Sequence, residues 1–395
     1  MKTDFDLIIN RRNTNSCKWD SQALRYHRND LLHFGVADMD FKSPEPIQRS
    51  LMGIVNHDIY GYTDLNEKFY QSIQNHYHQK YNIEIPLEWI VFSPRIINSA
   101  AAFVNVMTQD NDGVLINEPC YSPLKNAIIT NHRNPISIPL QFINNQWTMD
   151  FDLIETQALQ SNNNTMFFVN PDNPTGTVWN QESTQRLMKI AKNHNLTIFT
   201  DEIHADILKS GVKHHSLLEN LSLNDKIVVA NSSTKSFNIP GLEISYLIIP
   251  NHEIREKIQL ELNRMGFYNP NIFAGPALIT GYTNDECKQW LAELNLYVDA
   301  NETYVCDFLH EHCPQFIVYP HQGTYTLWIN YEQTNKTAEE IQEWFIEKVG
   351  AEVYMGSTFG PYGDGFIRLN IATSKLNLQQ LLTAMDENYH LISDD

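Results

Sequence analysis

The sequence predicts an α/β fold in which a mostly parallel sheet is covered by helices. Short, continuously apolar runs rich in β-branched and aromatic residues recur through the middle of the chain. Such runs are typical of strands that are buried on both faces. An amphipathic segment lies between two of these runs, and the order strand, helix, strand favours right-handed crossovers and therefore a parallel sheet.

Six strands and one helix are predicted in order along the chain. The strands are WIVFS from Trp89, GVLIN from Gly113, TMFFVN from Thr165, LTIFTD from Leu196, KIVVAN from Lys226 and SYLIIP from Ser245. The helix lies within residues 180–195, where apolar side chains share one face. Asn180 or Ser183 can cap its start, and Asn195 can end it.

The length of 395 residues is enough for two or three domains. We expect a large domain over residues 46–284, which holds all the predicted strands. Residues 1–45 and 285–395 then form a smaller α/β domain, and a long helical stretch at residues 285–313 joins the two.

Composition and charge exclude several classes of protein. The chain has 47 acidic and 28 basic residues, a net charge of -19, which argues against nucleic-acid binding. No stretch approaches the roughly 20 apolar residues of a membrane span, and the first ten residues do not resemble a signal peptide. Five cysteines without a CxxC pair indicate reduced thiols, so we expect a cytoplasmic protein.

No metal site is predicted. The segment LHEHCP offers His310, His312 and Cys313, but helical residues two apart point to different faces and do not chelate together. The same holds for His76 and His78.

Polar motifs follow three of the predicted strands. NPDNPTG occupies residues 170–176, DEIHAD occupies residues 201–206, and SSTK occupies residues 232–235. Taken singly, these motifs are explained as a turn, a helix cap and a surface lysine. However, the carboxyl ends of parallel strands form the ligand-binding edge of an α/β sheet. An amide, a carboxylate and an amine at three such ends predict one shared site.

Pyridoxal 5'-phosphate is the cofactor whose chemistry needs this set of groups. Lys235 is the candidate for its Schiff base, and Asp201 is the candidate partner of the protonated ring nitrogen. The amide of Asn173 can donate to the ring oxygen. The hydroxyl of Ser232 can donate to the phosphate.

The chain resembles the fold-type I aminotransferase superfamily, and within it the MalY/PatB-type cystathionine β-lyases, which are carbon–sulfur lyases. The resemblance is carried by NPxNPTG, DEIHAD and SxTKSFN, and it extends to FDLIINRRNTNSCKWD, GVADMDF, IYGYTD, EPCYSPL and GFIRLNIA. The KWD, ADMDF and DEIHAD segments are typical of the lyases. Ordinary aminotransferases usually have tyrosine where His204 stands. The resemblance implies a seven-stranded, mostly parallel sheet in the large domain.

The resemblance also implies roles for residues outside the three strand ends. Tyr121 would stack on the cofactor ring and assist catalysis, and Arg368 would bind the substrate carboxylate. For these two, the alternatives are a packing tyrosine and a structural salt bridge. Tyr62 would reach the phosphate of a neighbouring subunit, so the protein would be a homodimer. The remaining implied contacts are the backbone amides of Ile96 and Ile97 and the side chain of Thr234 at the phosphate, His204 at the cofactor, and the backbone of Val36 at the substrate.

Three positions depart from the superfamily pattern. Glu243 stands eight residues after the lysine, where the wider superfamily has an arginine that contacts the phosphate. Arg95 replaces a common glycine in the phosphate loop, and it either crowds the loop or adds a cation. The segment QGTYTLWIN, residues 322–330, lacks the glutamate and alanine that usually precede this tyrosine in the superfamily.

The predicted function is cleavage of L-cysteine thioethers by β-elimination, which gives a thiol, pyruvate and ammonia. Lys235, once released from the Schiff base, would remove the Cα proton. Two alternatives remain at this point. One is an aminotransferase of similar fold, and the other is a regulatory protein that acts through a protein partner.

Overall fold

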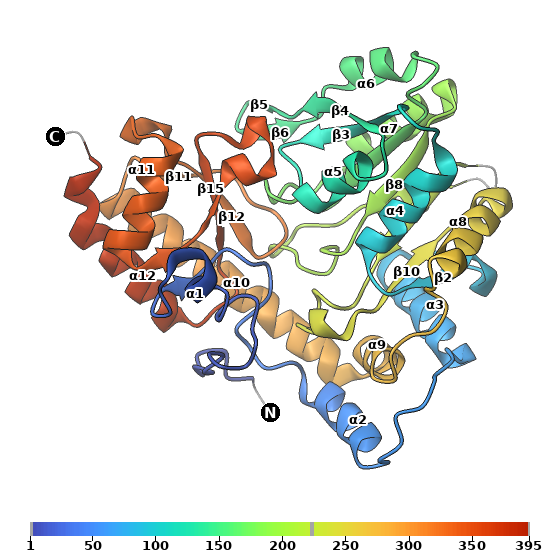
Figure 1. Cartoon of the computed structure of the whole chain (residues 1–395), viewed down its shortest axis with the longest axis horizontal. Helices are drawn as coiled ribbons and strands as arrows, with labels where there is room; N and C mark the ends of the chain where they lie inside the picture. Colours follow the sequence, from blue (N-terminus) through green and yellow to red (C-terminus); the bar gives the residue numbers. More distant parts are fainter. Residues whose placement is uncertain (1–2, 222–224, 394–395) are drawn as a thin grey trace.

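The computed structural model describes residues 3–221 and 225–393, and its centre is a seven-stranded sheet. The strand order is β2-β10-β9-β8-β7-β3-β4, and β10 alone runs antiparallel to its neighbours. The predicted α/β fold with a mostly parallel sheet is confirmed (Figure 1). The strands are β2 (Ile90–Ser93), β3 (Gly113–Glu118), β4 (Asn134–Pro139), β7 (Thr165–Val169), β8 (Thr197–Asp201), β9 (Ile227–Asn231) and β10 (Ser245–Ile248).

Both faces of this sheet are buried because alternate side chains enter two separate apolar cores. In β7, Met166 and Phe168 belong to the core under α3, α7 and α9, while Phe167 and Val169 belong to the core under α4, α5 and α8. Two-sided burial explains why most positions of the inner strands are apolar and do not alternate with polar residues. The helices are α3 (Glu67–Tyr81), α4 (Ile96–Met107), α5 (Ser122–Ile129), α6 (Phe151–Ala158), α7 (Gln181–His194), α8 (His252–Arg264) and α9 (Ala274–Thr283).

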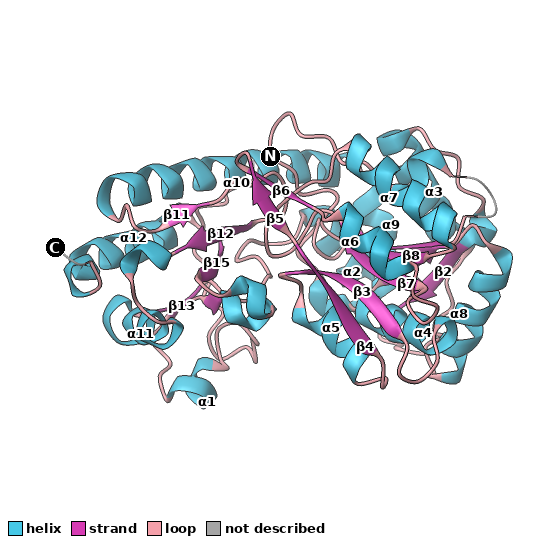
Figure 2. Cartoon of the chain, turned by 90° about the horizontal axis from the view of Figure 1, so that it is seen from above, coloured by secondary structure: helices cyan, strands magenta, loops and turns pink. Residues whose placement is uncertain are grey.

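A second, antiparallel sheet has the order β11-β12-β15-β14 and packs with the C-terminal helices (Figure 2). The N-terminal segment joins this part of the molecule, because β1 pairs with β13. A separate hairpin pairs β5 with β6. The strands are β1 (Leu32–His33), β5 (Gln141–Ile143), β6 (Gln146–Thr148), β11 (Ile317–Val318), β12 (Thr326–Asn330), β13 (Ala351–Glu352), β14 (Tyr354–Met355) and β15 (Phe366–Asn370). The helices are α1 (Gln22–Tyr26), α2 (Glu45–Val55), α10 (Asp285–His312), α11 (Ala338–Glu343) and α12 (Lys375–Asn388).

Local signals set the helix that the sequence predicted. Helix α7 begins after Asn180, whose side chain accepts a hydrogen bond from the backbone of Ser183, and it ends at Asn195 in the left-handed conformation. The predicted long helix from Asp285 is α10. No helix in the described part of the chain is long and apolar enough to cross a membrane.

Candidate active site

The carboxyl ends of β7, β8 and β9 bring the three predicted motifs to one edge of the sheet, and Lys235 lies at their centre. Its Nζ donates a hydrogen bond to the carbonyl of Ala37, 2.5 Å away. Burial lowers the pKa of Lys235 to about 8, with Arg368 acting in the same direction and with Asp38 and Asp201 opposing it. A substantial fraction of this amine is therefore neutral near pH 8, as a nucleophile or a general base requires.

Asp201 is the last residue of β8, and its carboxylate is buried without a matching cation. One of its oxygens accepts a hydrogen bond from the backbone N–H of Ile203 at 3.0 Å. Burial raises the pKa of Asp201 to about 6, although that hydrogen bond and the charge of Lys235 oppose the rise. Within residues 3–221 and 225–393, no lysine, arginine or histidine forms an ion pair with it. A buried carboxylate in this state fits a cationic ligand group such as a protonated pyridine.

Arg368 points from β15 into the same site, and its guanidinium is also buried without a counter-charge. Its Nη1 donates to Oδ1 of Asn173 at 2.8 Å, and its Nη2 donates to the carbonyl of Gly35 at 2.7 Å. Its Nε has no partner in the described structure. Burial lowers the pKa of Arg368 to about 10. An unpaired buried guanidinium with a free donor fits a carboxylate ligand, and no structural salt bridge occupies it among the described residues.

Arg368 also orients Asn173. It takes the amide oxygen of Asn173, so the amide nitrogen is left as the free end of that side chain, with no hydrogen bond to any described residue. The predicted donation from Asn173 to a ring oxygen fits this orientation.

His204 and Tyr121 add two neutral aromatic side chains to the site. Nδ1 of His204 is buried and has no hydrogen-bond partner among the described residues. The centroid of the His204 ring lies 5.7 Å from that of the Tyr325 ring. Burial lowers the pKa of His204 well below its usual value, so the imidazole is neutral. Tyr121 caps the start of α5, and burial raises the pKa of its phenol, which stays protonated.

The predicted phosphate contacts come from two places, the start of α4 and the segment that follows β9. Ile96 and Ile97 are its first two residues, and their amides have no acceptor within the described chain, as expected at a helix start. The hydroxyl of Ser232 lies 2.8 Å from that of Thr234 and 2.5 Å from the carbonyl of Ile244. Ser232 therefore has to turn its hydroxyl away from Ile244 to donate to a phosphate.

Two predicted residues have different surroundings from the rest. The carbonyl of Val36 accepts a hydrogen bond from Asn370. The carbonyl of Gly35 accepts one from Arg368, and the carbonyl of Ala37 accepts one from Lys235. Tyr62 is fully exposed in the segment between α2 and α3. Within one chain it does not contact the site.

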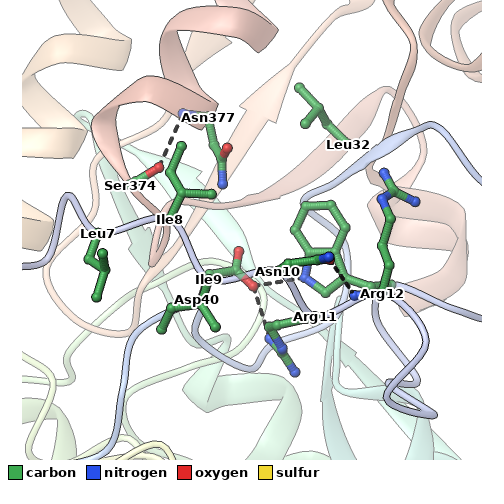
Figure 3. A pocket seen from close by; sticks show the side chains of 11 residues that line it. Leu7, Ile8, Ile9, Asn10, Arg11, Arg12, Leu32, Asp40, Ser374 and Asn377 are labelled. Carbon is green, nitrogen blue, oxygen red and sulfur yellow. Dashed lines mark hydrogen bonds and ion pairs between the residues drawn. The ribbon is translucent and has the colours of Figure 1, made fainter.

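The sequence did not predict the ion-pair cluster that holds the loop of residues 35–41 over Lys235. We call Arg11, Lys18, Asp38 and Asp40 the N-terminal clamp. Asp40 accepts hydrogen bonds from Lys18 Nζ, Arg11 Nη1 and the indole of Trp19, each at 2.9 Å. Figure 3 shows Arg11 and Asp40 beside a cavity of about 240 Å³ that the N-terminal segment shares with the start of α12. The opposite charges of the NRR and KW segments and of ADMDF were the available signal.

Comparison with known proteins is consistent with this geometry. Residues 35–385 match the family model described as aminotransferase class I and II. The chain is 30% identical over 380 residues to cystathionine beta-lyase PatB of Bacillus subtilis, covering 95% of this chain and 97% of that protein.

Two solved structures are also closely similar. Cystalysin from Treponema denticola, which contains pyridoxal 5'-phosphate, has a TM-score of 0.95 and 28% identity, with 100% of each chain covered. The pyridoxal-phosphate-bound C–S lyase of Staphylococcus hominis, in complex with the inhibitor L-cycloserine, has a TM-score of 0.91 and 28% identity, with 98% of each chain covered. From the family match over most of its length, the chain belongs to the aminotransferase class I and II family.

Proposed function

We propose that this protein is a pyridoxal-phosphate-dependent carbon–sulfur lyase that cleaves L-cysteine thioethers such as L-cystathionine. The observation that carries the proposal is the grouping of three buried, uncompensated groups: the amine of Lys235, the carboxylate of Asp201 and the guanidinium of Arg368. They match an aldehyde, a ring cation and a carboxylate in turn. The names of its relatives, cystathionine beta-lyase and C–S lyase, support the reaction class. Five free cysteines suit a reducing compartment such as the cytoplasm.

The cofactor supplies an aldehyde that binds amines covalently and a ring that accepts electron density from Cα. This chain's residues hold it and direct the proton transfers. Lys235 is the covalent attachment point, Asp201 keeps the ring nitrogen protonated, and Asn173 donates to the ring oxygen. The free amides of Ile96 and Ile97, together with Thr234 and Ser232, receive the phosphate.

Three side chains then act on the substrate. Arg368 binds the substrate carboxylate through its fork of donors, which fixes the orientation of the Cα–H bond. The amine of Lys235, displaced by the substrate, takes the Cα proton. The carbonyl of Ala37 holds that amine by the hydrogen bond seen in the structure. The phenol of Tyr121 is protonated, so it can donate a proton to the departing sulfur.

We infer that two copies of the chain complete each site. Exposed apolar side chains gather before α3, with Ile59, Tyr60 and Tyr62 at 65%, 57% and 103% exposure. A cavity of about 350 Å³, lined in part by Arg95, Phe267 and Pro270, lies at the start of α4. We infer that Tyr62 of a second copy enters this cavity, where Arg95 offers a polar contact and Phe267 and Pro270 offer apolar ones.

Substitution of Tyr62 by phenylalanine tests the shared site. We expect the Kd for pyridoxal 5'-phosphate to rise about tenfold, because one hydrogen bond to a charged phosphate is lost. Titration of the apoprotein measures this, and Tyr60→Phe is the matched control from the same segment. Sedimentation should show a dimer for all three proteins. A monomeric wild-type protein, or an unchanged Kd in Tyr62→Phe, would refute the inference.

The rate of covalent cofactor capture should follow the ionisation of Lys235. Since only the neutral amine attacks the aldehyde, we expect the rate to rise about tenfold per pH unit below pH 8 and to level off above it. Stopped-flow absorbance of the apoprotein mixed with the cofactor measures this. A rate that keeps rising toward the usual lysine pKa of about 10.4 would show that burial does not activate this amine.

The function itself is tested by incubation with L-cystathionine in the absence of a keto acid. We expect thiol, pyruvate and ammonia in equal amounts. Amino transfer to an added keto acid without these products would identify an aminotransferase instead. If the cofactor binds and neither reaction occurs with any of a panel of cysteine thioethers, the proposal is wrong and a partner-mediated role is favoured.

A further inference from the structure

Arg95 and Glu243 face each other just beyond the paired part of β2 and β10. The ladder pairs Ser93 with Ser245, and the antiparallel register places Arg95 opposite Glu243 two residues further along. Their side chains form an ion pair. Because cross-strand neighbours interact directly, this pair follows from the register. Arg95 has an extended backbone, with φ at -145°, so the position does not need glycine and the arginine does not crowd the loop.

The same pair borders the end of the site that receives the phosphate. Arg95 is the residue before Ile96 and Ile97, whose free amides start α4. Glu243 precedes Ile244, whose carbonyl meets the hydroxyl of Ser232. Burial raises the pKa of Tyr121, and the charge of Arg95 is among those that oppose the rise, which places Arg95 within electrostatic reach of the site.

The other two cations of the site are committed elsewhere. Lys235 donates to Ala37 and is the group that bonds to an aldehyde. Arg368 donates to Asn173 and Gly35 and is the candidate for the substrate carboxylate. Arg95 is thus the cation that the described structure offers to a phosphate at the start of α4.

The ion pair between Arg95 and Glu243 is open to exchange. The two side chains are 60% and 42% exposed, and an exposed pair of this kind contributes little to stability. A phosphate dianion held by helix amides is a stronger partner for a guanidinium than a hydrated carboxylate is. Arg95 can therefore leave Glu243 for a phosphate at small cost.

We propose that Arg95 is the cation that binds the cofactor phosphate and that Glu243 competes with the phosphate for it. When no phosphate is bound, Glu243 holds Arg95 beside the free amides at the start of α4. The negative charge of Glu243 weakens phosphate binding. This inference rests on the proposed cofactor, and it adds a binding residue and an internal competitor to that site. Of the two possibilities for Arg95, crowding the phosphate loop or adding a cation to it, we propose the second.

The test compares pyridoxal 5'-phosphate with pyridoxal, which lacks the phosphate. Kd values are measured by absorbance titration of the apoprotein for wild type, Arg95→Ala and Glu243→Gln. We expect Arg95→Ala to weaken binding of pyridoxal 5'-phosphate by about tenfold to a hundredfold and to leave pyridoxal binding unchanged. Glu243→Gln should tighten binding of pyridoxal 5'-phosphate several-fold, again without an effect on pyridoxal. Both effects should shrink as salt is added.

Lys257→Ala is the matched control, because Lys257 forms an exposed pair with Glu253 on α8. It should leave both Kd values unchanged. If Arg95→Ala weakens pyridoxal as much as pyridoxal 5'-phosphate, Arg95 has only a structural role. If Glu243→Gln weakens binding of pyridoxal 5'-phosphate, Glu243 supports the site and does not compete. These assays measure binding alone, so loss of the proposed lyase reaction would leave their result intact, and failure of wild type to bind the cofactor would reject the proposed function first.

Discussion

Replacing Lys235 with alanine should abolish turnover of L-cystathionine, with kcat lowered by at least about 10³-fold. The substitution removes the proposed covalent attachment point and the proposed base for the Cα proton, and general base catalysis alone is worth roughly 10²–10⁴-fold. Borohydride treatment of the loaded wild-type protein should fix the cofactor to Lys235, and mass spectrometry of peptides should locate it there. The alanine variant should bind the cofactor without this covalent mark.

Lys235→Arg separates the charge of this residue from its nucleophilicity. An arginine retains the positive charge, but it does not form the covalent bond or act as a base near neutral pH. We therefore expect Lys235→Arg to be as inactive as the alanine variant. Lys257→Ala, on the exposed face of α8, should retain full activity. Cofactor trapped at another lysine, or activity in either Lys235 variant, would contradict the assignment.

Much of the large sheet could be predicted because its strands are buried on both faces. Each of the six predicted runs overlaps a strand of the central sheet, and every residue of these six strands is buried. The order of polar motifs after β7, β8 and β9 predicted that they share one edge of the sheet, and they do, because these strands are parallel. Asn173, Asp201 and Lys235 could be chosen as candidates without knowledge of side-chain packing.

Strand β4 could not be predicted in the same way. Its sequence, NPISIP, contains two prolines, and such a segment normally indicates a turn or an irregular loop. The structure tolerates both because β4 is an edge strand that pairs only with β3 among the described strands. An edge strand needs hydrogen bonds on one side only, so proline is acceptable there.

The contribution of the N-terminal segment also depended on long-range contacts. Val36 was predicted by resemblance, but the carbonyls that accept hydrogen bonds from Arg368 and Lys235 are those of Gly35 and Ala37. Sequence pattern gives the alternation of a strand or helix, but this loop has neither. Which carbonyl faces which side chain is set by distant partners, Asn370 from β15 and Asn238 after Lys235.

The N-terminal clamp also holds the loop over Lys235, and we expect it to make Lys18 sensitive to substitution. Lys18 and Asp40 are 1% and 7% exposed, and their charged atoms lie 2.9 Å apart. Burial opposes the ionisation of Asp40, yet Lys18, Trp19 and Arg11 together hold its pKa below the usual value. The stabilisation is thus fully present at neutral pH, and it is lost as the pH falls through that lowered pKa.

Lys18→Met should cost about 3 kcal/mol of stability at neutral pH, because removing one partner leaves a buried carboxylate undercompensated. Urea unfolding at pH 7 measures this, and the difference from wild type should shrink in acid as Asp40 becomes protonated. The loosened loop should also raise the pKa of Lys235 toward its ordinary value, since that pKa is lowered mainly by burial. The pH dependence of cofactor capture should move upward with it, which a purely global loss of stability would not cause.

Two further variants test whether the lost stability comes from the unpaired charge of Asp40. In the double variant Lys18→Met with Asp40→Asn, no uncompensated charge is buried, and Arg11 retains Asp38 as its partner, so we expect much of the lost stability to return. Arg49→Met removes an exposed pair with Glu45 on α2 and should cost less than about 1 kcal/mol. If Lys18→Met costs no more than Arg49→Met and leaves the pH profile of capture unchanged, the clamp does not hold the loop. If the double variant is less stable than Lys18→Met, the cost lies in lost packing and not in the stranded charge of Asp40.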